Sequence, residues 1–134
     1  MHRDGRWLLG VRAPDLAFLP GLLGLLGGHL EPGDTDLEAT ARRELQEETG
    51  VDLSGVALSY LESALLPGSD RAQLTVTFVA EAPPAADPRV HDTAELTEVG
   101  WWTVAQAAAD PRCPIWLPAL LHRAAHHHPE TVDR

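Results

Sequence analysis

The segment GGHLEPGDTDLEATARRELQEETGV, residues 27–51, decides the fold, because it joins a glycine-rich turn to an acidic helix. Residues 33–36 (Gly-Asp-Thr-Asp) supply the turn and the N-cap, since short polar side chains accept from the free N–H groups of a first helical turn. All residues from Leu37 to Thr49 are compatible with a helix, and Gly50 suits the left-handed position that ends one. The sequence therefore predicts a helix over 37–49.

This predicted helix directs carboxylates toward the protein. At about 100° per residue its apolar residues form one stripe, made of Leu37, Ala41 and Leu45. Glu44 and Glu48 project within or beside the stripe, and Glu47 lies about a quarter-turn away. A solvated acidic helix would keep its carboxylates opposite the apolar face, so this placement points to a function.

Glutamates at this spacing need a partner, because neighbouring carboxylates repel and burial favours their protonated forms. A hard divalent cation removes the conflict, since it prefers several carboxylate oxygens with backbone carbonyls and water. The i, i+3, i+4 spacing of Glu44, Glu47 and Glu48 lets one metal cluster reach all three. Arg43 is placed to hold Glu47 by an i, i+4 pair. The alternative is an ordinary charged helix with Arg–Glu pairs, but the preceding glycine turn favours the metal site.

At these residues the sequence resembles the Nudix hydrolases. The box of that family is Gly, five residues, Glu, seven residues and then Arg-Glu-U-x-Glu-Glu-x-Gly-U, where U is a bulky aliphatic residue. The second half is matched without a gap by Arg43, Glu44, Leu45, Glu47, Glu48, Gly50 and Val51. Gly28 matches the opening glycine, and Asp34 stands for the first glutamate. The match departs from the family at one extra residue before the helix and at Leu26, where a proline is usual.

The resemblance implies an α/β fold, namely an α/β/α sandwich with a mixed central sheet. Together with a length of 134 residues, it predicts a single domain over residues 1–134. The family usually has a further strand before the one expected over residues 7–12, so the sheet is expected to be shortened at this N-terminal edge. Otherwise another part of the chain or a second subunit covers the edge, which makes a homodimer compatible with the sequence.

The resemblance also implies a metal-dependent reaction, the hydrolysis of a nucleoside diphosphate linked to another moiety. Mg²⁺, with Mn²⁺ as a substitute, would be held by Glu44, Glu47, Glu48 and a backbone carbonyl of Gly27 or Gly28. Glu48 is expected to be the most direct ligand and Arg43 to orient its neighbours. A carboxylate from the box or from Glu98 would accept the proton of the attacking water.

Further candidates lie outside the helix. Arg12 ends the strand expected over 7–12 and would contact substrate phosphates, or it is a surface arginine. His29 would contact substrate or stabilise the turn through its backbone neighbours. Pro67 follows Val51 at a spacing of 16 residues that resembles the ADP-ribose pyrophosphatases, although a Pro-Gly turn explains it more simply. A nucleoside triphosphate pyrophosphatase is an equally compatible interpretation.

Acidic residues also precede a pair of tryptophans, as in the Nudix stretch from which some members take a general base or an additional metal ligand. Glu95 and Glu98 are therefore candidates, with a solvated loop glutamate as the alternative. Trp101 and Trp102 should point to opposite faces of a strand, one of them into the core.

Periodicity and turn signals predict the other elements. Strands are expected over 7–12, 56–63 and 73–82 and around the two tryptophans, with a short strand before the box, a turn over 65–70 and a loop over 82–93. Helices are expected over 104–109 and 114–125, the second with four inward side chains, Ile115, Leu117, Leu120 and Leu121. The histidines at 122 and 126–128 are interpreted as a solvated tail rather than a metal site.

Composition excludes several function classes. A net charge of −10 argues against binding to a nucleic-acid backbone, so a small nucleotide substrate is expected. No apolar run is long enough to span a bilayer, the first residues lack the core of a signal peptide, and Cys113 has no second cysteine to pair with. A cytoplasmic protein without membrane contact is expected. The alternative from another class is a Nudix-fold binding module that has lost catalysis, and an acidic helix without metal is a third interpretation.

Overall fold

The central sheet is organised around one strand. In the computed structural model, which describes residues 1–67 and 72–127, β2 (Arg6–Arg12) pairs along one edge with β1 (His2–Arg3) and β3 (Leu23–Gly24). Its other edge pairs with β6 (Leu96–Trp102). All three pairings are antiparallel. The turn into β2 has positive φ at Asp4 and Gly5, as a tight hairpin requires.

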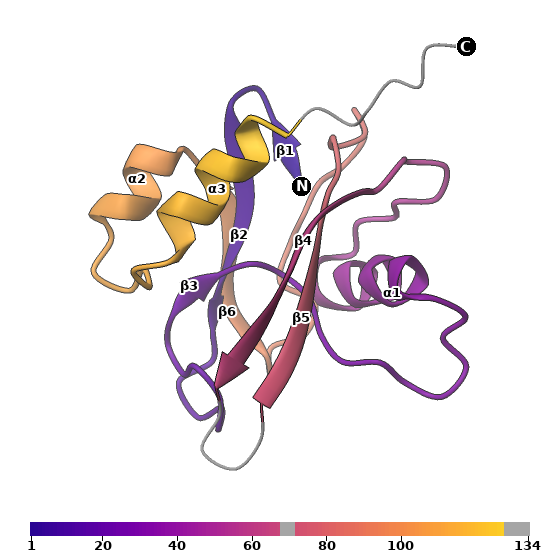
Figure 1. The fold of residues 1–134 in the computed structure, drawn as a ribbon, viewed down its shortest axis with the longest axis horizontal. Coiled ribbons are helices and arrows are strands. Elements are labelled where there is room, and N and C mark those ends of the chain that lie inside the picture. Colours follow the sequence, from indigo (N-terminus) through magenta and orange to yellow (C-terminus); the bar gives the residue numbers. More distant parts are fainter. Residues whose placement is uncertain (68–71, 128–134) are drawn as a thin grey trace.

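A second, two-stranded sheet lies beside the first (Figure 1). It consists of β4 (Ser59–Pro67) and β5 (Ala72–Val79), which are antiparallel. A parallel bridge between His2 and Glu81 joins β1 to the segment after β5. The mixed character expected of the sheet is confined to this bridge. The further N-terminal strand that is usual in the family is shortened here to the two-residue β1, as expected, and another part of the chain pairs with it.

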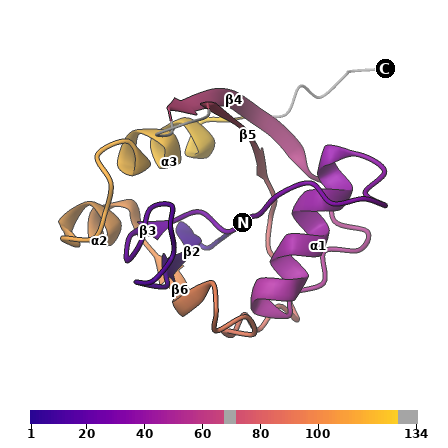
Figure 2. The same cartoon turned by 90° about the horizontal axis from the view of Figure 1, so that it is seen from below.

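Helices cover both faces of these strands, which gives the expected α/β/α arrangement (Figure 2). Side chains of β2 alternate between two apolar clusters. Trp7, Leu9 and Val11 pack with α2 (Val104–Ala109) and α3 (Leu117–Ala125). Leu8 points the other way and belongs to the cluster of Leu45, a residue of α1 (Leu37–Thr49). The two clusters therefore place α1 opposite α2 and α3.

The box helix has the predicted bounds. Asp36 is its N-cap and accepts a 2.7 Å hydrogen bond from the Ala39 N–H. Gly50 ends it in the left-handed conformation, φ 76°, and its N–H donates to the Gln46 carbonyl. Helix α2 also has the predicted bounds, because Thr103 and Gln106 form a capping box at its start.

The strand predicted over 56–63 is displaced toward the C-terminus. It begins at Ser59 because the Arg42 guanidinium binds the carbonyls of Leu53 and Val56, which holds the preceding segment away from the sheet. It continues through residues 65–67, where a turn was predicted, because these pair with residues 72–74 of β5. The rest of that turn, residues 68–70, lies outside the described residues.

Two apolar side chains predicted to face inward are exposed. Ile115 is 97% exposed, because α3 begins only at Leu117 and Ile115 lies in the turn before it. Leu117, Leu120 and Leu121 are buried as predicted. Leu37 is 44% exposed, because the first turn of α1 extends beyond the apolar cluster that buries Leu45.

The two tryptophans point to opposite faces as predicted, but neither is fully buried. Trp102 packs against the cluster below α2 and α3, and Trp101 packs against the cluster below α1. The Arg3 guanidinium lies 5.0 Å from the centre of the Trp101 ring, a cation–π geometry. No helix in the described ranges is long and apolar enough to cross a membrane.

Candidate active site

The turn before α1 brings the backbone of Gly28 against the carboxylate of Glu44. A Cβ atom added to Gly28 would lie 2.1 Å from Glu44 Cδ and 2.2 Å from its Oε2. At such distances one of the two groups must move, so the glycine serves the close approach of Glu44 and not an unusual φ. Its neighbour Gly27 donates its N–H to Glu48 Oε1 at 3.0 Å. These two contacts therefore join the glycine turn to α1 through the side chains of Glu44 and Glu48.

Arg43 holds the turn and the helix together through several charge-assisted bonds. Its Nε and Nη2 donate to the two oxygens of Asp34, each at 3.0 Å. Its Nη1 lies 2.8 Å from Glu44 and 3.2 Å from Glu47, so the predicted i, i+4 pair with Glu47 is present. Nη2 also donates to the His29 carbonyl at 2.9 Å. This planar fork is a geometry that a lysine cannot reproduce.

Asp34 takes a structural position at the base of the turn. Besides Arg43, it accepts from the Glu31 N–H and the Thr40 hydroxyl, each at 2.9 Å. The hydrogen bonds from Arg43 hold the pKa of Asp34 far below its usual range, and the bond from Glu31 adds to the effect. Asp34 therefore remains ionised, and the shorter carboxylate reaches Arg43 in spite of the extra residue in the turn.

Glu48 is the carboxylate of the site whose negative charge is least offset by neighbouring groups. Its side chain is buried, with 5% of the residue exposed. Its pKa is raised to about 8, chiefly by burial and next by the nearby charge of Glu44, while the hydrogen bond from the Gly27 N–H opposes the shift. The pKa of Glu44 is also raised, by burial first, although Arg43 counteracts this effect. Glu47 is exposed, although the three carboxylates were expected to point toward the protein, because its quarter-turn offset carries it beyond the apolar stripe.

The segment between β5 and β6 brings two more carboxylates toward Glu48. Negative charges on Glu95 and Asp92 contribute to the raised pKa of Glu48, so both lie within electrostatic range of it. The segment is connected to α1 by two hydrogen bonds, from Arg89 N–H to the Thr49 carbonyl at 3.1 Å and from His91 N–H to the Glu48 carbonyl at 2.8 Å. Glu95, one of the two residues expected near the tryptophans, is thus brought to the site.

Glu98 is not brought together with the box glutamates. It pairs with Val11, whose side chain packs toward α2 and α3, and residues directly opposite each other on paired strands share a face. The Glu98 carboxylate forms an ion pair with Arg112, which also binds Asp110 at 2.9 Å. Glu98 therefore lies on the face of the sheet opposite α1.

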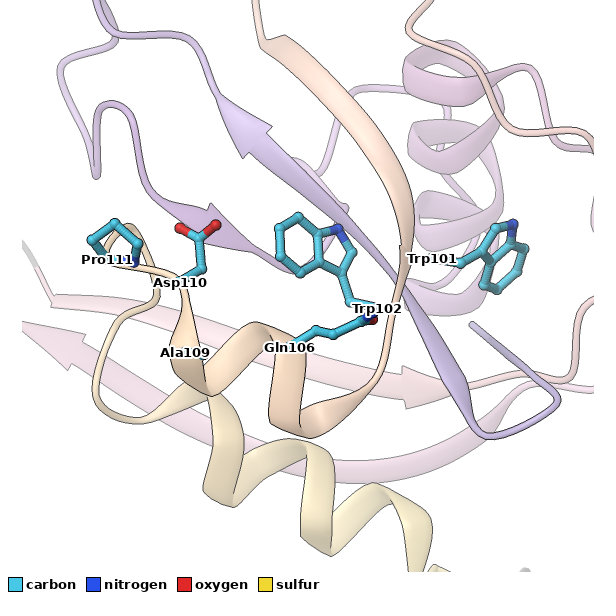
Figure 3. A pocket seen from close by; sticks show the side chains of 6 residues that line it. All are labelled: Trp101, Trp102, Gln106, Ala109, Asp110 and Pro111. Atoms are coloured by element: carbon cyan, nitrogen blue, oxygen red, sulfur yellow. The ribbon is translucent and has the colours of Figure 1, made fainter.

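A hollow of about 540 Å³ lies beside Trp102 on this same side, away from the box glutamates. Figure 3 shows the Trp102 ring between β6 and the end of α2, with Trp101 pointing away from it. The hollow is lined by Trp101, Trp102, Gln106, Ala109, Asp110 and Pro111. A second hollow, of about 660 Å³, lies between the start of α1 and the apolar face of the β4–β5 sheet, where Tyr60, Leu74 and Phe78 line it.

The remaining candidates lie at the margin of the site or outside it. Arg12 Nε and Nη2 donate to the Phe18 carbonyl at 3.0 and 2.8 Å, so its guanidinium is engaged by the loop after β2. The His29 side chain is exposed, while its carbonyl accepts from Arg43. Pro67 is the last residue of β4, and its side chain lies outside the described part of the chain.

These donors fit a hard divalent cation. Glu48 is buried and ionisable, the negative charges of Glu44, Glu95 and Asp92 act on it, and its hydrogen bond comes from the neutral Gly27 N–H. Over residues 1–67 and 72–127, no three His, Cys, Asp or Glu side chains converge to enclose an ion. The described side chains thus do not by themselves form the three-carboxylate cluster expected of Glu44, Glu47 and Glu48, and Mg²⁺ commonly completes its shell with water and substrate phosphates.

Sequence reasoning did not identify Asp92 or His91 as neighbours of the box. Both lie in a segment rich in Pro and Ala, and no periodicity relates that segment to α1. The signal that was available was the acidic character of residues 92–98, which drew attention to Glu95 and Glu98 but did not separate them. The strand register places Glu98 on the side of the sheet away from α1, whereas Glu95 precedes the first residue of β6.

Comparisons with known proteins agree with this geometry. The family profile described as NUDIX domain matches residues 1–123. The NAD-capped RNA hydrolase NudC of Chromobacterium violaceum is 34% identical over 125 residues, which are 93% of this chain and 42% of the relative. The chain thus spans less than half the length of this relative.

Solved structures share the fold. The MutT NUDIX hydrolase from Burkholderia pseudomallei superposes with a TM-score of 0.76 and 23% identity, over 92% of this chain and 91% of that one. The NUDIX domain of Shewanella oneidensis NrtR, complexed with ADP ribose, gives a TM-score of 0.73 at 23% identity, over 92% and 79%. On the profile match and the intact second half of the box, this chain belongs to the Nudix hydrolase family.

Proposed function

We propose that this chain is a Mg²⁺-dependent pyrophosphohydrolase that cleaves a nucleoside diphosphate linked to another moiety. The observation that carries the proposal is Glu48, a buried carboxylate whose pKa is raised by burial and by Glu44, and whose hydrogen bond comes from a neutral N–H. A buried anion in this position is stabilised when a cation binds beside it. Mn²⁺ is proposed as a substitute for Mg²⁺.

Each residue of the site has a proposed role. Glu48 and Glu44 hold the cation, with Glu47 and a backbone carbonyl of Gly27 or Gly28 as further donors. Bound Mg²⁺ would offset charge on the diphosphate oxygens and acidify a water for attack at phosphorus. Arg43 keeps Glu44 and Glu47 in place through the bonds it donates from Nη1. Arg12, His29 and Pro67 are proposed substrate contacts at the margin.

The proton acceptor is proposed to be Glu95 or a box carboxylate. Glu95 is favoured because its charge acts on Glu48. Glu98, the other candidate, is held by Arg112 on the opposite side of the sheet, and it would have to leave that ion pair to act as a base. Parallel substitution of the two glutamates distinguishes them.

The substrate class is proposed from similarity. The name of the NudC relative specifies an NAD-capped RNA, and NAD contains a diphosphate between two nucleosides. A dinucleotide diphosphate of this kind, or an ADP-ribose-like compound, fits the proposed reaction. Nucleoside triphosphates are the second candidate. We keep the proposals of a single domain, of a small nucleotide rather than nucleic acid as substrate, and of a cytoplasmic protein.

The experiment that tests the reaction is hydrolysis of a panel with Mg²⁺ and with chelator. The panel contains ADP-ribose, NAD, NAD-capped RNA and the nucleoside triphosphates. We expect Mg²⁺-dependent turnover of one class and a loss of about 100-fold in Glu48→Gln, since it removes a metal ligand. Glu38→Gln, the same chemical change at an exposed position of α1, is the control. Tight nucleotide binding without turnover would support the inactive binding module instead.

A further inference from the structure

The loop between β5 and β6 caps the C-terminal end of the box helix. The Arg89 and His91 N–H groups donate to the Thr49 and Glu48 carbonyls, at 3.1 and 2.8 Å. Carbonyls in the last turn of a helix have no N–H partner within it. The loop supplies these partners, so its backbone is hydrogen-bonded directly to Glu48, which carries the most buried carboxylate of the site.

Gly50 leaves the space that the His91 ring occupies. A Cβ atom at position 50 would lie 2.4 Å from His91 Cε1 and 2.6 Å from its Nε2. Gly50 also has a φ of 76°, which a residue with a side chain rarely adopts. Gly50 therefore serves both the left-handed end of the helix and the close contact with the His91 ring, which a Cβ at this position would displace.

The segment after His91 carries Asp92 and Glu95, whose negative charges act on Glu48. Asp92 Oδ1 accepts from the Ala94 N–H at 3.1 Å, and its carbonyl accepts from the N–H groups of Glu95 and Leu96, at 3.2 and 2.9 Å. These bonds form a tight turn that leads into β6. Because the turn is rigidly hydrogen-bonded, a displacement of His91 moves Asp92 and Glu95 with it.

We propose that His91 is a positioning residue, which fixes the loop that carries Asp92 and Glu95 against the C-terminal end of α1 through its backbone bond to Glu48 and its ring contact with Gly50. The inference rests on the proposed metal-dependent hydrolysis, because the position of these carboxylates matters only if they surround a metal and a substrate. The raised pKa of Glu48, to which both loop carboxylates contribute, agrees with this placement.

The test uses substitutions that separate the ring contact from backbone strain. Gly50→Ala introduces both. Gly55→Ala is the matched control, because Gly55 has a φ of 75° and nothing within 4 Å of the added Cβ. His91→Ala removes the ring without strain, and the double variant Gly50→Ala/His91→Ala keeps the strain without the clash. Melting temperature and circular dichroism verify that each variant is folded.

The first readout is amide hydrogen exchange at residues 89 and 91 without metal or substrate. We expect Gly50→Ala to lose about tenfold or more of the protection at these two amides, and Gly55→Ala to keep it. In the double variant, the amides of residues 89 and 91 should exchange as fast as in His91→Ala and no faster. Unchanged protection in Gly50→Ala, or losses that add in the double variant, would overturn the contact as the link between loop and helix.

The second readout is Mg²⁺ affinity by calorimetry, together with kcat and KM. For His91→Ala we expect a loss of about 10- to 100-fold in Mg²⁺ affinity, the range for residues that orient metal ligands. We also expect kcat to fall more than KM rises. Loss of amide protection with full Mg²⁺ affinity and full kcat would overturn the positioning role.

The two proposals fail in distinguishable ways. Absence of turnover in the parent protein would reject the proposed reaction, while exchange and Mg²⁺ affinity would still decide whether His91 positions the loop. Absence of Mg²⁺ binding in the folded parent protein would overturn both. If Gly50→Ala does not fold, His91→Ala decides the positioning role alone.

Discussion

The carboxylate of Glu44 occupies the space above Gly28 where any other residue would place its side chain. The distance of 2.1 Å from a Cβ at position 28 to Glu44 Cδ means that one of the two must move. The opening glycine of the box is therefore explained by its contact with the carboxylate of Glu44, which stands 16 residues later in the sequence (44 − 28).

Gly28→Ala is accordingly expected to displace Glu44 and to lower turnover by about 100-fold, since misplacement of catalytic groups by about 1 Å has such an effect. The measurement is kcat/KM together with Mg²⁺ affinity. Gly24→Ala serves as the control, because a Cβ at Gly24 meets nothing within 4 Å and its φ is not positive. Equal activity of the two variants would show that Glu44 moves aside without consequence.

Arg43→Lys is expected to lower the urea midpoint of unfolding, because an ammonium group cannot replace the two bonds to Asp34 and still reach Glu44. Urea unfolding measures this change. Arg89→Lys, in an exposed ion pair with Asp87, should change the free energy of unfolding by less than about 0.5 kcal/mol. Comparable losses in both variants would mean that the Arg43 network is no stronger than a surface pair.

The free energy of unfolding of the metal-free protein is expected to fall as pH rises from about 4.5 to about 8. In this window folded Glu48 keeps a proton that the unfolded chain has released, because burial raises its pKa in the folded state. The expected loss is on the order of a few kcal/mol, at about 1.4 kcal/mol per pKa unit. Thermal unfolding with chelator, compared with Glu48→Gln, measures it.

Added Mg²⁺ should raise the melting temperature more at about pH 8 than at about pH 5, because metal competes with the proton for the Glu48 carboxylate. The same dependence on pH in Glu48→Gln and in the parent protein would assign the effect to another group.

Glu95→Gln should lower kcat by 10²- to 10⁴-fold if Glu95 accepts the proton, the range for general-base catalysis. Glu98→Gln should leave kcat within about twofold and cost less than about 1 kcal/mol of stability through its ion pair with Arg112. Steady-state kinetics at saturating Mg²⁺ measure both. The reverse order of effects would return the role to Glu98.

The local signals in the sequence located the box well. Asp36 and Gly50 bound α1 because capping and helix termination depend on the residues at the ends themselves. The burial of Glu48 followed from helical periodicity alone. By contrast, Leu37 and Ile115 were misplaced, because their exposure depends on how far a neighbouring element extends.

Tertiary contacts could not be predicted from any local pattern in the sequence. The start of β4 depends on Arg42, which binds two carbonyls of the preceding loop. The side of the sheet on which Glu98 lies depends on the register between β2 and β6, which are distant in sequence. The contact of His91 with Gly50 is of the same kind, because it joins two segments that are distant in sequence.

The central position of β2 has a consequence for how this protein is made. Trp7 pairs with Trp102, so β2 waits for a strand synthesised some 95 residues later (102 − 7). At roughly 5–20 residues per second, the ribosome needs roughly 5–20 s to deliver β6. During that interval α1 can form its own hydrogen bonds. The apolar side chains on both faces of β2 still lack the later residues that complete their two clusters. A chaperone that shields an N-terminal apolar strand would act in this window.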